Sequence, residues 1–497
     1  MTLSQPASTL TPSVIVECEY LVIGSGAGGS VAARELARAG HDVLVLEEGP
    51  LANTAEFGET SLSNLTRKLY RNGGIQPFLG KPTIGFGEGS CVGGSTVVNG
   101  GLIWRTPERF LDHWKTRKQI HGYGTDDLTP HFEKIEQALG VQHHTFPDTT
   151  NLDSQALENG CNALGWKIVP VPRALNGCVQ ANQCGAGCPS GGKQSMLVSY
   201  LPDAVSHGAR IFHGARVTQL HQSRGNITHV SAQIDDDGGT RQLKITPRFV
   251  ILAAGAIQTP FLIRKSGIKS VAGNRLEFHI NLRFAATFRE PINAQQGTIF
   301  TTQVQEFIDD DLLIMATNYR PSYVAAALAH FDNTTLQRFM DNQDHGGLFV
   351  AQVRPDCTAQ ISTRFGKNPV VKYQLSKQDI IKIRDAMEKT AELLFASGAT
   401  EIYLPIQNSA SIATLDGVRD VVRKLSPKAL QMISVHAMAS CAMGIEENSA
   451  VDTNGKVLGV DNLFVCDASV LPSNIGESPQ GTIMAIAHEI IDRHLQQ

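Results

Sequence analysis

Val22-Ile-Gly-Ser-Gly-Ala-Gly-Gly29 decides the fold of this chain, because glycines at positions 24, 26 and 29 directly follow an apolar run. Residues 20–23 predict a strand, residues 30–39 predict a helix, and residues 43–46 predict a second strand that ends at Glu47. A strand, a tight glycine turn, a helix, a strand and an acid in this order are typical of the βαβ unit that binds a dinucleotide.

Each part of this unit has a physical role. Gly24 permits the tight turn, Gly26 lets a pyrophosphate approach the backbone, and Gly29 lets the helix pack closely on the sheet. Unpaired N–H groups and the dipole at the helix start favour phosphate. Glu47 follows Gly24 by 23 residues, about where an acid contacts the ribose hydroxyls. The unit alone does not distinguish FAD from NAD.

The composition is that of an ordinary globular protein, and the length predicts two domains. The chain has 497 residues, of which 42% are hydrophobic and 18% are charged. A net charge of −4 gives no electrostatic reason to expect nucleic acid or an anionic membrane as partner. The sequence contains no run of 18 or more apolar residues, so it predicts no transmembrane helix. Residues 1–13 predict a disordered tail rather than a secretion signal. We therefore expect a cytoplasmic location. The alternative is export in complex with another subunit that carries the signal.

Elements of two kinds follow along the chain. Apolar runs at 249–254 and 463–467 predict buried strands, and 482–495 predicts a helix with one apolar face. Between them, alternating patterns at 348–353 and 370–375 predict antiparallel strands, and 377–396 has helical periodicity. We therefore expect an α/β fold with a doubly wound, Rossmann-like nucleotide domain and an inserted domain that has a mostly antiparallel sheet flanked by helices. The predicted division assigns 14–105, 200–290 and 430–497 to the nucleotide domain, and 106–199 and 291–429 to the substrate domain and cysteine segment.

Four further patches carry a resemblance to a known family. They are Gly89-Ser-Cys-Val-Gly-Gly-Ser-Thr-Val-Val-Asn-Gly100, the stretch from Gly255 to Ile268, the stretch from His436 to Gly444, and Asp467-Ala-Ser-Val-Leu-Pro472 continued by Ser478-Pro-Gln-Gly-Thr-Ile483. Together with the first unit, these patches resemble the glucose–methanol–choline (GMC) flavoprotein oxidoreductases. The resemblance spans residues 20–495 and is nearest to the branch of cysteine-containing long-chain alcohol oxidases and dehydrogenase subunits.

The resemblance implies FAD as the cofactor. The residues that it assigns to the FAD site are Gly24, Ser25, Gly26, Ala27, Gly29, Glu47, Gly93, Gly94, Ser95, Asn99, Val217, Asp467, Ala468 and Pro479. Some family members tether the flavin through a histidine just before the asparagine that matches Asn99. Val98 occupies that position here, so we expect FAD to be held without a covalent bond.

The resemblance also implies the chemistry. Family members oxidise an alcohol to a carbonyl, with the hydroxyl proton passing to a base and a hydride to the flavin N5. His436 matches the catalytic histidine, and an imidazole suits the role of base because its pKa lies near neutrality. The family has histidine or asparagine where Ser478 stands, so we expect His436 alone to act as base and Ser478 at most to position the substrate. His279 lies in a stretch that resembles another family patch and is interpreted as a structural or flavin-domain residue rather than as a base.

Three cysteines cluster at Cys178, Cys184 and Cys188, directly before a proline. Closely spaced cysteines of this kind can ligate an iron–sulfur cluster, and the spacing resembles that of GMC dehydrogenase subunits with a [3Fe–4S] centre. A zinc site completed by His207 or His213 is a second interpretation. Plain thiols are the third and the favoured one.

The sequence therefore predicts an FAD-dependent alcohol dehydrogenase or oxidase that acts on a bulky hydrophobic alcohol. One alternative is a sugar or polyol dehydrogenase subunit whose cluster passes electrons to a protein partner. Others are a flavin-dependent lyase on the same fold and a flavin-binding subunit without activity.

Overall fold

A computed structural model describes residues 2–10, 15–143, 151–236, 239–363, 366, 368–445 and 449–496. The first unit forms as the sequence predicts. Strand β2 (Ile15–Ile23) leads into helix α1 (Ala27–Arg38), and β3 (Val43–Glu47) follows beside β2 in parallel. No helix among the described residues is both long and apolar enough to span a membrane.

The first sheet is mostly parallel and contains the glycine turn. Within the described residues it has eight strands, in the order β1-β9-β3-β2-β12-β11-β10, with β23 also paired to β12. The remaining strands of this sheet are β1 (Gln5–Pro6), β9 (Arg210–His213), β10 (Ala215–Ser223), β11 (Asn226–Asp236), β12 (Gly239–Leu252) and β23 (Leu463–Val465). Strands β10, β11 and β12 form an antiparallel meander, whereas the other pairs are parallel. Buried runs such as Val43–Glu47 suit parallel strands covered on both faces.

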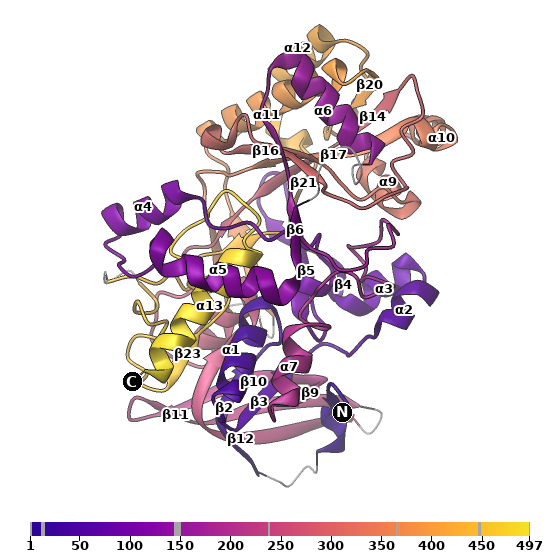
Figure 1. Ribbon diagram of the computed structural model, residues 1–497. Coiled ribbons are helices and arrows are strands. Elements are labelled where there is room, and N and C mark those ends of the chain that lie inside the picture. Colours follow the sequence, from indigo (N-terminus) through magenta and orange to yellow (C-terminus); the bar gives the residue numbers. More distant parts are fainter. Residues whose placement is uncertain are drawn as a thin grey trace.

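Helices cover this sheet in the lower half of Figure 1. Helix α1 packs against α7 (Tyr200–Ser206) and α13 (Gln480–Leu495), and α13 packs against α5 (Thr125–Leu139). The helix from the end of the chain therefore closes over the helix from its beginning. Helix α8 (Gly255–Lys265) directly follows β12 and begins at the cavity described below.

The second sheet is mostly antiparallel, as the sequence predicts. Within the described residues it has eleven strands, in the order β18-β19-β4-β5-β21-β14-β17-β16-β15-β7, with β20 also paired to β14. Their bounds are β4 (Tyr70–Leu79), β5 (Ile84–Gly89), β7 (Ile168–Pro170), β14 (Ile280–Phe288), β15 (Thr302–Val304), β16 (Leu312–Ala316), β17 (Gly346–Val353), β18 (Ala359–Ser362), β19 (Val370–Tyr373), β20 (Ala399–Tyr403) and β21 (Met432–Ser434).

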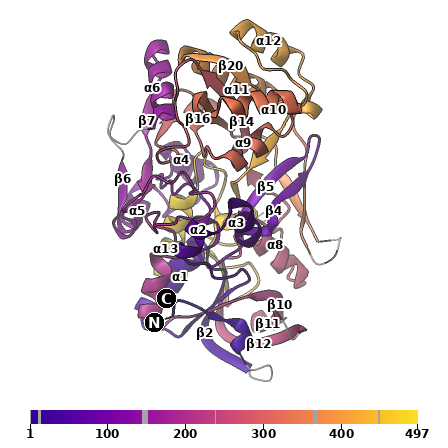
Figure 2. The ribbon, with the colours of Figure 1, turned by 90° about the vertical axis from the view of Figure 1, so that its right-hand side faces the viewer.

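Helices flank this second sheet in the upper part of Figures 1 and 2. Helix α11 (Lys377–Ala396) packs against α6 (Leu152–Leu164), α12 (Leu415–Arg423) and β17. Helices α9 (Pro321–Leu328) and α10 (Asn333–Asp341) contact each other, and α9 packs against β14. The other elements are α2 (Thr54–Glu59), α3 (Leu62–Leu69), α4 (Glu108–Arg117) and two small two-stranded sheets, β6 (Val141–His143) with β8 (Pro172–Ala174) and β13 (Glu277–Phe278) with β22 (Ala437–Met438).

One prediction near the start of the chain is wrong. Residues 5–6 form β1, which pairs in parallel with β9, and Ala7 is buried in the core. Ser4 is also buried and hydrogen-bonds to His213. Backbone pairing and these two buried side chains therefore order residues 4–7, while residues 11–13 of the predicted tail lie outside the described residues.

The two sheets draw on segments far apart in the chain. Strands β4, β5, β14 and β21 all belong to the second sheet, although the predicted division places their residues in the nucleotide domain. The α/β class with a doubly wound first layer and an antiparallel second layer is confirmed. The segment boundaries stay a proposal.

Candidate active site

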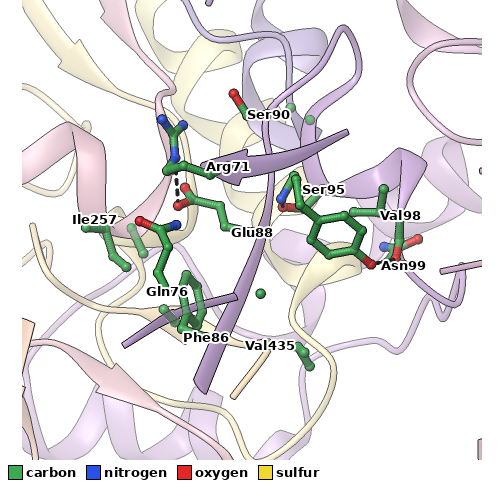
Figure 3. A pocket seen from close by; sticks show the side chains of 18 of the residues that line it. Arg71, Gln76, Phe86, Glu88, Ser90, Ser95, Val98, Asn99, Ile257 and Val435 are labelled. Atoms are coloured by element: carbon green, nitrogen blue, oxygen red, sulfur yellow. Dashed lines mark hydrogen bonds and ion pairs between the residues drawn. The ribbon is translucent and has the colours of Figure 1, made fainter. Parts of the chain in front are cut away.

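A cavity of about 860 Å³ opens between the two sheets. Its lining comes from the glycine turn, the segment after β5, the start of β10, the start of α8, the loop around His436 and the start of α13. Every predicted cofactor residue except Gly29 and Gly93 lines it, and so do His436 and Ser478. Figure 3 shows part of this wall, with Ser95, Val98 and Asn99 on one side and Ile257 on the other.

The glycine turn has the form that a phosphate cradle requires. Gly24 has φ +102°, and a Cβ at this position would lie 2.3 Å from the Ala253 carbonyl oxygen. A Cβ on Gly29 would lie 2.1 Å from the Gly24 oxygen, so this glycine is needed for packing. A Cβ on Gly26 would meet nothing within 4 Å. Gly26 therefore borders open cavity at the N-terminus of α1, where N–H groups and the helix dipole favour an anion.

Glu47 is buried at the end of β3 and holds the turn together. Its Oε2 accepts hydrogen bonds from the Ser25 N–H (3.0 Å) and hydroxyl (2.7 Å), and its Oε1 accepts one from the Gly49 N–H (2.9 Å). Burial raises the pKa of Glu47. The Ser25 hydroxyl in turn accepts a hydrogen bond from the Gly93 N–H (3.0 Å). Since both Ser25 donors are used by Glu47, this serine secures the acid, which keeps lone pairs for a ribose hydroxyl.

The segment from Gly93 to Asn99 forms the opposite wall. Gly94 has φ +56°, and a Cβ there would lie 2.8 Å from the Gly26 Cα, so the two glycines allow two backbones to meet. The Lys193 ammonium donates to the carbonyls of Val97 (2.7 Å) and Asn99 (2.7 Å). It also donates to the Cys184 carbonyl (2.8 Å), and burial lowers the pKa of Lys193 to about 8. The cysteine segment thus supports the backbone of the cavity wall.

Asp467 is a buried helix cap that also lines the cavity. Its Oδ2 accepts from the Gly255 N–H (2.9 Å) and the Thr259 hydroxyl (2.5 Å) at the start of α8. Its Oδ1 accepts from the Ser469 N–H (2.8 Å) and hydroxyl (2.5 Å). Burial raises the pKa of Asp467, and these four donors stabilise its carboxylate. The side chain therefore fixes two backbone segments at the cavity.

A charged group lies at another part of the wall. Arg71 pairs with Glu88 (3.0 Å) and with Glu48, so one cation lies between two carboxylates. Figure 3 shows the Arg71–Glu88 pair with Gln76 next to it. The positive charge of Arg71 is therefore compensated by the carboxylates of Glu48 and Glu88.

His436 follows β21, and its imidazole forms part of a chain of three side chains. His436 Nδ1 lies 3.0 Å from His279 Nδ1, and His279 Nε2 lies 2.5 Å from Asn474 Oδ1. The backbone N–H of His279 also donates a hydrogen bond to the backbone carbonyl of His436 (3.2 Å). Burial holds the pKa of His279 well below its ordinary value and lowers the pKa of His436 to about 4, so both rings are neutral near pH 7.

The direction of these hydrogen bonds follows from the backbone around Asn474. Its Nδ2 donates to the Phe278 carbonyl (2.9 Å), and its Oδ1 accepts from the Gly476 N–H (2.9 Å), which fixes the amide orientation. His279 must therefore donate from Nε2 to Asn474, and its neutral Nδ1 must be an acceptor. The proton in the pair of histidines then belongs to His436 Nδ1. His436 Nε2 is left with a lone pair, in a ring that lines the cavity.

This chain of side chains is the feature that sequence reasoning missed. His279, which the sequence predicts to be a structural or flavin-domain residue, touches His436 directly. The partners lie 157 and 195 residues apart in sequence, and nothing local marks Asn474 as a partner of His279. The one signal available was that His279 lies in a family patch.

The metal interpretations of the cysteine segment are not supported. Cys178, Cys184 and Cys188 are free thiols, and no group of three or more His, Cys, Asp or Glu among the described residues could hold a metal ion. His213 is bound to Ser4, and His207 lies by Asp203, so neither completes a zinc site. The Cys188 sulfur instead accepts from the Lys193 N–H (3.3 Å), and the Arg173 guanidinium lies 3.8 Å from the Cys184 sulfur.

Comparisons with known proteins give consistent results. A family model described as GMC oxidoreductase matches residues 66–281 and, for its C-terminal part, 357–487, and a model of an NAD(P)-binding Rossmann-like domain matches 22–52. An uncharacterized GMC-type oxidoreductase of Sinorhizobium fredii is 32% identical, over 98% of this chain and 96% of that protein. A long-chain-alcohol oxidase of Arabidopsis thaliana is 28% identical, over 97% of this chain and 68% of that protein.

Among solved structures, pyridoxine 4-oxidase from Mesorbium loti superposes with a TM-score of 0.73 at 16% identity. The superposition covers 97% of this chain and 99% of that one. At this identity the match shows a shared fold.

Proposed function

Because the chain belongs to the GMC oxidoreductase family, as its sequence resemblance predicted, we propose that His436 is the base of an FAD-dependent alcohol oxidation in the cavity between the sheets. The protein is an FAD-dependent oxidoreductase that acts on CH–OH groups. The observation that carries the assignment of the base is the hydrogen-bond chain from Asn474 through His279 to His436.

The residues present fit FAD. Gly26 borders open space at a helix start, Glu47 keeps acceptor capacity, and Gly94 lets the opposite wall approach. We propose that these residues hold the dinucleotide part and that Ser95, Asn99 and the start of α13 hold the flavin. When bound, FAD supplies the hydride acceptor of the reaction. Val98 stands where a tethering histidine would be, which supports non-covalent binding.

His436 removes the hydroxyl proton in this proposal. The hydrogen bond to His279 leaves the lone pair on Nε2 and fixes the plane of the ring, so the base is oriented before the substrate arrives. Ser478 also lines the cavity and can donate or accept one hydrogen bond to the substrate oxygen. The proton passes from the substrate hydroxyl to Nε2, and His436 becomes an imidazolium.

The lining favours a bulky hydrophobic alcohol. The apolar side chains that face the cavity from the second sheet and its neighbours are Phe86, Leu102, Phe300, Met315, Leu348 and Val350. Such a wall binds a hydrocarbon chain through apolar burial. The similarity to a long-chain-alcohol oxidase agrees with this preference.

A visible spectrum tests the proposal. The purified protein should show a flavin spectrum that primary alcohols of increasing chain length bleach under anaerobic conditions. Re-oxidation by air or by a dye then identifies the electron acceptor, and a lyase or an inactive flavin-binding subunit would leave the flavin oxidised.

The His436→Ala variant is the second arm. It should retain flavin and lose about a hundredfold or more in the rate of bleaching, as expected for removal of a general base. An unchanged rate in this variant contradicts the assignment of the base.

A further inference from the structure

Arg283 is a cation of the cavity wall without a partner. It lies on β14, and its guanidinium makes no hydrogen bond or ion pair with any residue that the structure describes. Burial lowers the pKa of Arg283 to about 10, so the group remains charged near neutrality. A half-buried charge that nothing compensates costs free energy, and such a group calls for a ligand.

The acids of the cavity are all used elsewhere. Glu47 binds Ser25 and Gly49, Glu48 and Glu88 pair with Arg71, and Asp467 caps α8. Asp235 lies on β11, in the first sheet, and accepts from Gln233 and Thr240. Each carboxylate that lines the cavity therefore has other partners, and none of them pairs with Arg283.

The strand register puts Arg283 in the floor of the substrate half. Asn281 pairs with Gln352 and Ile433, Arg283 pairs with Val350, and all five line the cavity. The alternate side chains, among them Leu282 and Phe284, belong to the core on the other side of the sheet. Arg283 also borders a second cavity of about 280 Å³ whose lining contains no acid.

A second polar group next to Arg283 is also without a partner. The Asn281 side chain is 5% exposed, and its Oδ1 is buried with no hydrogen-bond partner. Its amide makes no hydrogen bond with any described side chain or backbone group, although it lines the cavity. Because residues two apart on a strand share a face, the Asn281 amide, whose NH₂ group can donate, and the Arg283 guanidinium face the same space.

We propose that Arg283, assisted by the Asn281 amide, binds a carboxylate at the far end of the substrate, so that the substrate is a hydroxy acid with an apolar chain. The inference rests on the proposed function only for the oxidation of the CH–OH group at the other end of the substrate. A guanidinium offers two parallel N–H donors that match a carboxylate. The carboxylate is bound and not altered, while the distant CH–OH group is oxidised to a carbonyl.

The spacing sets the kind of hydroxy acid. Arg283 lies four residues along the strand direction from His279, whose N–H binds the His436 carbonyl. Four residues of extended chain span on the order of 13 Å. Asn281 and Gln352 lie on the floor between these two points, and the apolar Val350, Met315 and Leu348 lie level with Arg283 or beyond it. A chain with a hydroxyl at one end and a carboxylate at the other suits this separation of the two backbone positions.

The first test compares substrates of one chain length. The probes are 10-hydroxydecanoate, its methyl ester and 1,10-decanediol, with flavin bleaching as the readout. The wild type should have a KM about 10- to 100-fold lower for the acid than for the ester, because charge-assisted hydrogen bonds are among the strong ones. Arg283→Gln should remove this preference by raising the KM for the acid to that for the ester, and Arg283→Lys should restore part of it. Arg289→Gln, an exposed arginine just after β14, is the matched control.

The second test does not require oxidation. Decanoate carries the carboxylate and lacks the carbinol, so it should raise the melting temperature of the wild type and of Arg289→Gln but not of Arg283→Gln. Equal shifts in the wild type and Arg283→Gln, or equal KM values for acid and ester in the wild type, overturn the proposal. If no alcohol bleaches the flavin but decanoate still discriminates the variants, the proposed function fails and the carboxylate site stands.

Discussion

The imidazole of His436 decides what this site can do, because its ring has one nitrogen for the protein and one for the substrate. The protein side is occupied by His279, whose own tautomer is set by Asn474. The Phe278 carbonyl can only accept and the Gly476 N–H can only donate, so these two backbone groups fix the Asn474 amide. The amide in turn fixes the tautomers of His279 and His436. The protonation pattern is thus anchored in the main chain.

The low pKa of His436 has a consequence for the dependence of activity on pH. A base must be unprotonated, and burial lowers the pKa of His436 from 6.5 to about 4. With a neutral alcohol, bleaching should therefore persist as the pH falls through 6.5 and should be lost as it approaches 4. Stopped-flow bleaching with 1-decanol across pH 4 to 8 measures this. A half-loss near pH 6.5 would show that the imidazole titrates as an ordinary histidine.

Substitution of Asn474 tests the tautomer. Asn474→Leu has a similar volume and removes the acceptor for His279, so the Nδ1–H form of His436 is no longer enforced. A wrong tautomer of a catalytic histidine costs up to about 10⁴-fold in kcat, and we expect a loss of at least tenfold with KM little changed. Nitrogen-15 NMR of labelled histidines should show His436 with a protonated Nδ1 in the wild type and a mixture in the variant. A slow variant that retains the wild-type tautomer would assign the loss to another cause.

At the scale of elements, local patterns predicted much of the chain. The glycine turn with its strands and helix, the helix at 377–396 and the C-terminal helix lie where periodicity placed them. Strands β4, β5 and β14 were not predicted to join one sheet, because their pairing is set by contacts between distant segments. For the same reason the His279–Asn474 hydrogen bond and the unpaired Arg283 could not be predicted from spacing, since each depends on which strands become neighbours.

Two glycines of one turn should respond differently to alanine. In Gly29→Ala the Cβ meets the Gly24 oxygen at 2.1 Å, so the fold itself is strained and the melting temperature falls. In Gly26→Ala the Cβ meets nothing within 4 Å and φ is −71°, so the apoprotein should be as stable as the wild type. The same Cβ projects where a pyrophosphate approaches, so FAD content should fall about tenfold or more. Full flavin occupancy in Gly26→Ala would show that the phosphates lie elsewhere.

At the scale of the whole molecule, the two sheets meet around one cavity. The glycine turn of the first sheet and the strands β5, β14, β17 and β21 of the second contribute to the same lining. Each sheet has its own large buried core, so the cavity lies where two separately built layers face each other. A ligand that fills this space contacts both layers.

Binding of FAD should therefore stabilise the molecule as a unit. A ligand that binds only the folded state adds about 2.7 kcal/mol at a free concentration one hundred times its Kd. Calorimetry of flavin-stripped protein should show a melting temperature that rises with added FAD and levels off on saturation. ADP reaches only the glycine turn and should give a smaller rise, because it leaves the contacts of the second sheet unmade. Gly26→Ala provides the control, since its apoprotein should melt like the wild type and gain little from either ligand. If ADP and FAD raise the wild-type melting temperature equally, the second sheet does not contribute to the binding of the cofactor.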